Sequence, residues 1–339
     1  MASNDQLKAL IKSHAEGDDS RFYAVALQMA AFAARGGKAK LAQELRELID
    51  EVKAKASQQA PTSRRPVPLA QPRGELAGIL MAEYPSTRLS EVVLEESLAL
   101  RLNRVVLEQR QRERIRQHGL SPLRKLLLAG PPGTGKTMTA RALAGELGLP
   151  LFTVQLDGLI TKYLGETSAK LRLVFDAIRS TRGVYLFDEF DALGTDRGTP
   201  NEVGEIRRVL SSFLQFVEVD DSDALVIAAT NNVGLLDQAL FRRFDLVLEF
   251  SLPSDELALV VMKNRLAIIG ADDVDWASLL PHARGLSAAD IVRACDQATK
   301  DAILEGGRAL ETADVVRALA DRQAGHQAGR PSPKTRRSK

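Results

Sequence analysis

A glycine-rich segment, Gly130 to Thr137, carries the residues best suited to chemistry. It reads Gly-Pro-Pro-Gly-Thr-Gly-Lys-Thr, follows a short apolar run and opens an amphipathic stretch. Glycines let backbone N–H groups surround phosphate oxygens without side-chain collisions, and the start of the next helix adds partial positive charge. Lys136 supplies a charge for the β- and γ-phosphates, and Thr137 a hydroxyl for Mg²⁺. The strand-to-helix setting argues against a chance glycine turn. The predicted nucleotide-binding residues are Pro132, Gly133, Thr134, Gly135, Lys136, Thr137 and Met138.

Two later apolar runs end in polar residues with matching chemistry. Val184 to Phe187 is followed by Asp188 and Glu189. Asp188 is suited to binding nucleotide-bound Mg²⁺ together with Thr137, because hard cations prefer oxygen ligands, and Glu189 is suited to polarising the attacking water. Asn231 follows another run and is suited to a hydrogen bond with the γ-phosphate or that water. A simple turn, which Asn favours, is the alternative for Asn231.

Five short apolar runs alternate with amphipathic stretches over residues 75–252. The runs are Leu126–Ala129, Leu151–Val154, Val184–Phe187, Leu225–Ala229 and Leu246–Phe250. Strands separated by helices predict an α/β subdomain whose five-stranded parallel sheet is covered on both faces. Ligands bind at the strand ends of such sheets. We expect Asn231 to lie there between the phosphate loop and the acidic pair.

The flanking regions differ in composition. Residues 1–56 show helical apolar spacing and predict a small N-terminal helical bundle. Residues 57–74 contain four prolines and three arginines, which is typical of a linker. After Pro253, residues 253–324 again predict helices. Residues 325–339 are basic, contain no acidic residue and predict a disordered tail.

The formal net charge of +2 and the single cysteine, Cys295, indicate which partners and which cellular compartment to expect. A near-neutral chain lacks the global basic field that drives non-specific nucleic-acid binding, so we expect no nucleic-acid partner. One cysteine excludes a disulfide within the chain and favours a reducing compartment. We interpret Cys295 as a small buried hydrophobe rather than a nucleophile. Neither a signal peptide nor a membrane-spanning run is visible, so the expected location is the cytoplasm, with no membrane contact.

The phosphate loop, the acidic pair and Asn231, in this order, resemble the AAA+ superfamily of ATPases. The resemblance covers residues 78–320 and implies a P-loop NTPase (AAA+) core with a C-terminal helical lid. Lys162-Tyr163-Leu164-Gly165 narrows it to the strict AAA family, because it looks like the central-pore loop of protein-translocating members. In a ring, such tyrosines would grip an extended polypeptide by stacking and apolar contact. Taken alone, the segment is equally compatible with an ordinary loop.

The segment from Leu236 to Asp245 resembles the second region of homology of the AAA family. The resemblance implies that an arginine reaches into the neighbouring subunit's site, where a charged planar fork suits the γ-phosphate. The familiar pattern separates two such arginines by two residues, whereas Arg242 and Arg243 are adjacent here, so either is the candidate. The alternative is a surface ion pair with Asp237 or Asp245.

A last segment, Gly285 to Ile291, resembles the lid segment that packs near the adenine, with Ala288 where glycine is common.

The whole resemblance implies an ATP-hydrolysing ring, most often a hexamer, that uses ATP and Mg²⁺ to remodel, unfold or translocate proteins through a central pore. The N-terminal bundle is expected to recruit a substrate or partner, and a separate protease is one such partner. Three alternatives stay open: an ATP-dependent switch that does not thread its partner, a nucleic-acid motor, and a module that binds nucleotide only structurally. The Asp188-Glu189 pair argues against the last.

Overall fold

The computed structural model describes residues 71–159, 164–190, 200–231, 241–267, 274–306 and 308–328, together with Gln43. The chain divides into two compact units, Met1–Val67 and Pro68–Lys339. All secondary structure discussed below belongs to the second unit. The predicted N-terminal bundle apart from Gln43, the predicted linker up to residue 70 and the end of the predicted tail lie outside the described residues. These domain assignments therefore stay predictions.

A six-stranded sheet forms the centre of the second unit, in the order β1-β3-β4-β5-β2-β6. Its strands are β1 (Leu80–Glu83), β2 (Lys125–Ala129), β3 (Leu151–Val154), β4 (Val184–Phe187), β5 (Leu225–Thr230) and β6 (Leu246–Glu249). β1 runs antiparallel to β3, and all other neighbouring strands pair in parallel. The predicted parallel strands are therefore confirmed, with boundaries within one residue of the predicted runs.

β1 is the strand that the sequence pattern missed. It lies at the edge of the sheet, where a strand has a hydrogen-bonded neighbour on one side only. Leu80 is buried, but the following Met81 is 49% exposed. Leu80, Met81 and Ala82 are all apolar, but only Leu80 is buried, so the edge position and not the residue types distinguishes this strand from those at the centre.

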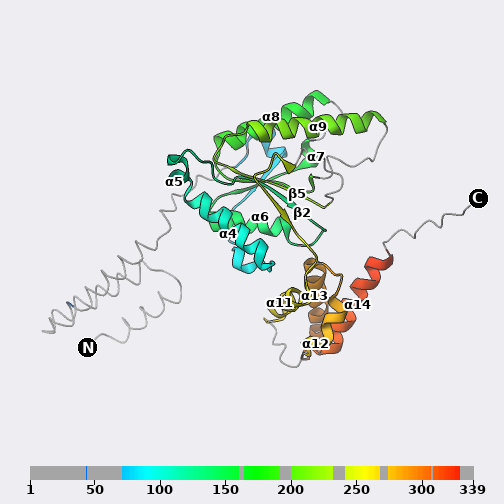
Figure 1. Cartoon of the computed structure of the whole chain (residues 1–339). Coiled ribbons are helices and arrows are strands. Elements are labelled where there is room, and N and C mark those ends of the chain that lie inside the picture. Colours follow the sequence, from blue (N-terminus) through cyan, green and yellow to red (C-terminus); the bar gives the residue numbers. More distant parts are fainter. Residues whose placement is uncertain are drawn as a thin grey trace, which may run out of the picture. The chain divides into compact units, whose positions relative to one another are not determined.

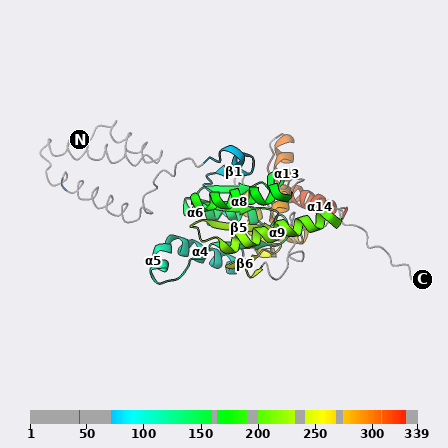
Figure 2. The same ribbon diagram turned by 90° about the horizontal axis from the view of Figure 1, so that it is seen from above.

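Successive strand residues enter two separate cores, one on each face of the sheet. Leu127 joins the cluster beneath α8 and α9, whereas Leu126 and Leu128 join the cluster formed with α4 and α6. The alternation follows from the two-residue period of a strand, and burial on both faces explains the unbroken apolar runs. Figures 1 and 2 show α8 and α9 side by side over one face, with α4 and α6 on the other. These helices are α4 (Glu96–Arg110), α6 (Lys136–Leu147), α8 (Leu164–Ser180) and α9 (Pro200–Val219).

Four helices after the sheet form a bundle with its own core, at the place of the predicted helical lid, whose role over the nucleotide stays a prediction. They are α11 (Asp255–Leu266), α12 (Trp276–Ala283), α13 (Ala288–Leu304) and α14 (Thr312–Ala328). Cys295 is fully buried in this core, and burial raises the pKa of its thiol to about 12. This confirms its interpretation as a buried hydrophobe. α14 continues past Gly325, where the sequence predicted the tail to begin.

Short elements complete the second unit. They are η1 (Gly74–Gly78), η2 (Leu89–Glu91), α5 (Arg112–Gln117) and α7 (Leu156–Leu159). Within the ranges that the structure describes, no helix combines the length and apolar character needed to cross a membrane.

Candidate active site

The carboxyl ends of three neighbouring strands bring the predicted site residues to one edge of the sheet. β5 lies between β2 and β4, with Ala129 opposite Thr230 and Phe187 opposite Ala228. The N–H of Gly130, which opens the phosphate loop, donates to the carbonyl oxygen of Thr230 at 3.2 Å. Asn231 therefore follows the strand between the phosphate loop and the acidic pair, as the sequence predicted.

The phosphate loop has a backbone that only glycine adopts readily. Gly133 and Gly135 have φ values of 75° and 102°, in the left-handed region. Gly130 meets a different restriction, because a Cβ there would lie 2.1 Å from the carbonyl oxygen of Phe250. The first glycine thus permits the close approach of the end of β6. The next two let the loop curl into the first turn of α6.

Lys136 is folded into the loop that precedes it. Its side chain is buried, and its Nζ donates to the carbonyl oxygens of Gly130 at 2.8 Å and Pro131 at 2.7 Å. The hydroxyl of Thr134 also donates to the oxygen of Pro131, at 2.8 Å. The ammonium group is therefore held in the concavity of the loop. Pro132 and Met138, also predicted to contact nucleotide, are exposed on its outer side.

Thr137 and Asp188 meet across the edge of the sheet. The Thr137 hydroxyl donates to Oδ2 of Asp188 at 2.7 Å, and the Glu189 N–H donates to Oδ1 at 2.9 Å. A hydroxyl and a carboxylate in contact are the oxygen ligands that Mg²⁺ prefers, so the donor set fits this ion. Among the described residues other than glycine, Glu189 alone has a positive φ, of 50°. Such local strain is typical of functional positions.

The lid contacts the phosphate loop directly. The Ala289 N–H, at the start of α13, donates to the carbonyl oxygen of Gly133 at 3.0 Å. A Cβ on Gly133 would lie 2.4 Å from the hydroxyl oxygen of Ser287. Ser287 caps α13, because its hydroxyl accepts from the Asp290 N–H at 3.2 Å and donates to the Asp290 carboxylate at 2.5 Å. The segment predicted to pack near the nucleotide therefore touches the loop that opens α6.

An apolar hollow of about 30 Å³ lies where the lid, the phosphate loop and the start of α4 meet. Its lining includes Val93, Leu94, Thr134, Leu257, Val261 and Ala288. Its apolar character suits contact with one face of a purine. The sequence pattern missed Val93 and Leu94, because nothing local distinguishes them from ordinary core residues.

Comparison with known proteins agrees with this geometry. Residues 126–252 match the family model for ATPases associated with various cellular activities (AAA). The AAA family ATPase y4kL of Sinorhizobium fredii is 36% identical over 332 residues, which is 97% of this chain and 98% of that protein. The chain belongs to the AAA family of ATPases.

Other AAA relatives are longer. ATP-dependent zinc metalloprotease FtsH 3 of Sphaerobacter thermophilus is 36% identical over 255 residues, covering 73% of this chain and 52% of that protein. The proteasome-activating nucleotidase of Aeropyrum pernix is 35% identical over 221 residues, covering 60% of this chain and 52% of that protein. This AAA chain therefore spans about half the length of these two relatives. The family match and the ATPase relatives identify it as an ATP-hydrolysing enzyme.

The two candidate arginines of this AAA ATPase have different surroundings. Arg242 is exposed, whereas Arg243 is partly buried and forms an ion pair with Glu218 at the end of α9. The alternative prediction, an ion pair of one of these arginines with Asp245, is wrong, because neither arginine pairs with Asp245 in the described structure. Oδ2 of Asp245 instead accepts from the backbone N–H groups of Arg124 and Lys125, both at 2.9 Å. Asp237 lies outside the described residues.

The predicted pore loop is largely outside the described part of the chain. Lys162 and Tyr163 fall in the gap before α8, and Leu164 and Gly165 are its first two residues. The side chains of these four residues are not described. Their role therefore stays a prediction from the sequence.

Proposed function

We propose that this AAA ATPase is a ring-forming motor that remodels, unfolds or translocates protein substrates through a central pore. The 2.7 Å hydrogen bond between Thr137 and Asp188 carries the ATPase part of the proposal, because it joins the phosphate loop, with its buried Lys136, to the acidic pair. Two relatives support a protein substrate through their names, one a metalloprotease and the other a proteasome-activating nucleotidase.

The chain's own residues divide the work of ATP cleavage. Lys136 and the loop N–H groups bind the phosphates, and Thr137 and Asp188 would hold Mg²⁺, which would supply positive charge at the phosphates. Glu189 accepts a hydrogen bond from the attacking water and polarises it. Asn231 orients that water or the γ-phosphate from the neighbouring strand.

A second copy of the chain completes the site in this proposal. Arg242 or Arg243 of the adjacent subunit stabilises the charge on the γ-phosphate, in a head-to-tail ring that is most often a hexamer. The exposure of Arg242 and the pairing of Arg243 with Glu218 favour Arg242 as the trans-acting group. Tyr163, flanked by Lys162, Leu164 and Gly165, contacts the substrate in the pore.

In this proposal, the regions outside the α/β subdomain recruit partners and cover the nucleotide. Residues 1–56 recruit a substrate or a partner, which includes a separate protease, and residues 57–74 link them to the motor. Residues 253–324 form the lid over the nucleotide, and residues 325–339 form a basic tail. A conformational switch that does not thread its partner differs in one respect: replacing Tyr163 with alanine would leave the effect on the partner intact.

The direct test is the variant Glu189→Gln. It should bind ATP with wild-type affinity and assemble normally, but turn over about 10²–10⁴-fold more slowly, because the amide cannot polarise water as the carboxylate does. Phosphate release measures the turnover, titration with a fluorescent ATP analogue measures the affinity, and light scattering measures the assembly. Glu113→Gln, an exposed carboxylate on α5, is the matched control and should turn over normally. Near-normal hydrolysis by Glu189→Gln would remove Glu189 from its role.

A further inference from the structure

A polar pocket of about 590 Å³ lies at the opposite ends of the same strands from the nucleotide site. Its walls come from the segments that lead into β2, β4 and β5. The charged residues of the lining are four arginines and two aspartates: Arg116, Arg124, Arg179, Arg182, Asp221 and Asp223. Several guanidinium groups therefore converge on one opening, at a place that the ATPase reaction does not use.

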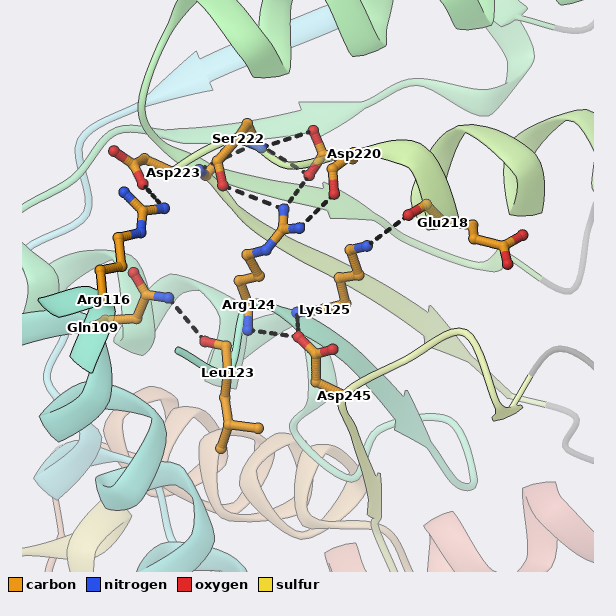
Figure 3. Close-up of polar contacts among 11 residues, drawn as sticks. Gln109, Arg116, Leu123, Arg124, Lys125, Glu218, Asp220, Ser222, Asp223 and Asp245 are labelled. Carbon is orange, nitrogen blue, oxygen red and sulfur yellow. Dashed lines mark hydrogen bonds and ion pairs between the residues drawn. The ribbon is translucent and has the colours of Figure 1, made fainter. Parts of the chain in front are cut away.

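Three of these arginines already have anionic partners within the chain, and one of them is Arg179, which pairs with Asp176 at 3.8 Å. Arg124 pairs with the fully buried carboxylate of Asp220, at 2.6 Å, and also donates to the carbonyl oxygen of Ser222, at 3.2 Å. Arg116 pairs with Asp223. Figure 3 shows the pairs of Arg124 and Arg116, together with the backbone contacts that hold Arg124 in place. Their charges are compensated, and they form a rigid frame for the pocket.

Arg182 is the exception. It is partly buried two residues before β4, and its Nε–H is buried without an acceptor in the described structure. No hydrogen bond or ion pair of its guanidinium is found among the described residues. Burial lowers the pKa of Arg182, and the nearby charge of Arg112 lowers it further, while Asp223 opposes the shift. Buried donors in proteins are almost always satisfied, so Arg182 is the arginine of this pocket that is open to an added acceptor.

We propose that this pocket is a docking site for an acidic segment of a partner protein, with one carboxylate received by Arg182. A planar guanidinium matches a carboxylate in a two-bonded geometry, and such charge-assisted bonds are the strong ones. The pocket is wide and open at the surface, which fits a peptide side chain on its backbone. Leu120 is 64% exposed in the segment that forms one wall, and it offers an apolar contact beside the charge.

The proposal is independent of the ATPase mechanism. Arg182 precedes β4, whereas Asp188 and Glu189 follow it, so the full length of the strand separates the two sites. A change at Arg182 should leave ATP turnover unaltered. Loss of peptide binding with normal turnover would therefore concern this pocket alone, and failure of the ATPase proposal would leave it untouched.

The test uses the full-length chain and a fluorescein-labelled hexaglutamate peptide, with hexaglutamine as the uncharged probe. The wild type should bind hexaglutamate and not hexaglutamine. Arg182→Gln should weaken binding about tenfold, as expected for loss of one charge-assisted pair. Asp223→Asn should strengthen binding several-fold, because it releases Arg116 from its internal partner. Arg172→Gln, an exposed arginine on α8, should bind like the wild type.

The opposite signs of the first two changes exclude misfolding as a common explanation, and melting curves check each variant. Equal peptide binding by the wild type and Arg182→Gln would overturn the proposal. Binding of inorganic phosphate that is lost in Arg182→Gln, without any binding of the peptide, would also overturn it by assigning the pocket to a small anion.

Discussion

The two ends of the central strands satisfy their polar groups in different ways. At the carboxyl ends, Lys136 donates to the neutral carbonyl oxygens of Gly130 and Pro131, in a loop shaped by left-handed glycines. At the amino ends, Arg124 and Asp220 neutralise each other in a side-chain ion pair, and the Asp220 side chain is completely buried. In the first arrangement, the two hydrogen bonds of the ammonium group to the loop go to neutral carbonyl oxygens, which phosphate oxygens can replace. In the second arrangement, each charge is neutralised by a partner within the chain.

This difference separates binding from stability. A lysine held by neutral oxygens can exchange them for phosphate oxygens at small cost, because both sets accept the same hydrogen bonds. A buried arginine with its own carboxylate has no such freedom, and breaking the pair leaves an uncompensated charge. Substitution of Lys136 should therefore affect ATP binding, whereas substitution in the Arg124–Asp220 pair should affect the free energy of unfolding.

The largest expected effect is at the amino ends. Asp220→Ala removes the only carboxylate paired with Arg124 in the described structure, and it should lower the free energy of unfolding by about 3–5 kcal/mol. Urea unfolding measures the change. Asp221→Ala, at the exposed neighbouring position, is the control and should alter stability by less than about 0.5 kcal/mol. Equal effects of the two substitutions would contradict the assignment of Asp220 as a structural anchor.

A somewhat smaller effect is expected at the carboxyl ends, and it should appear in binding instead. Lys136→Ala should weaken ATP binding about a hundredfold, which corresponds to about 2.8 kcal/mol, while the unfolding midpoint without nucleotide changes little. Titration with a fluorescent ATP analogue checks the affinity. Lys300→Ala on the exposed face of α13 should bind ATP normally. A large loss of stability in Lys136→Ala without a loss of ATP affinity would contradict the assignment of Lys136 to ATP binding.

The smallest effect concerns a neutral contact near the amino ends. The buried Tyr185 hydroxyl lies 2.9 Å from the carbonyl oxygen of Thr181 and 3.1 Å from that of Ala177, so it ties the end of α8 to β4. Tyr185→Phe should cost about 1 kcal/mol of stability, with ATP affinity unchanged. Urea unfolding measures the change, and Lys300→Ala, at an exposed position of α13, serves as the control.

The pH dependence of this contact sharpens the test. Burial raises the pKa of Tyr185 well above its ordinary value. A raised folded-state pKa stabilises the protein below the unfolded-state value, and that contribution is lost as pH rises through the range above about pH 10. The wild type should therefore lose stability in this range more steeply than Tyr185→Phe. Parallel curves for the two proteins would contradict the burial argument.

The sequence alone predicted which residues meet at the carboxyl ends of the strands, but it did not predict the side-chain contacts at their amino ends. The phosphate loop is a local pattern within eight residues, and Asp188 and Asn231 each follow an apolar run that ends at the same edge. Parallel pairing alone places them together. Arg124 and Asp220 are 96 positions apart, and no periodicity indicates that these two charges meet.

Other omissions have the same origin. The partner of Arg243, Glu218, belongs to a different element and meets it only through the packing of α9 beside β6. Val93 and Leu94 line the apolar hollow because the lid folds back over the start of α4. β1 was missed although Leu80 to Ala82 are apolar, because a short apolar run alone does not distinguish a four-residue edge strand from part of a helix or a loop. Contacts made by tertiary packing leave no trace in residue spacing.

The central claim, that ATP is cleaved at a site shared by adjacent copies of the chain, is tested most directly by mixing two inactive variants. Glu189→Gln lacks the water-polarising carboxylate, and the double variant Arg242→Ala/Arg243→Ala lacks the trans-acting arginine. Each should hydrolyse ATP poorly alone. Mixed in equal amounts and allowed to reassemble, they should recover about a quarter of the wild-type rate, because a head-to-tail ring then contains complete sites. A mixture as inactive as its components, or normal hydrolysis by the double arginine variant alone, would contradict the claim.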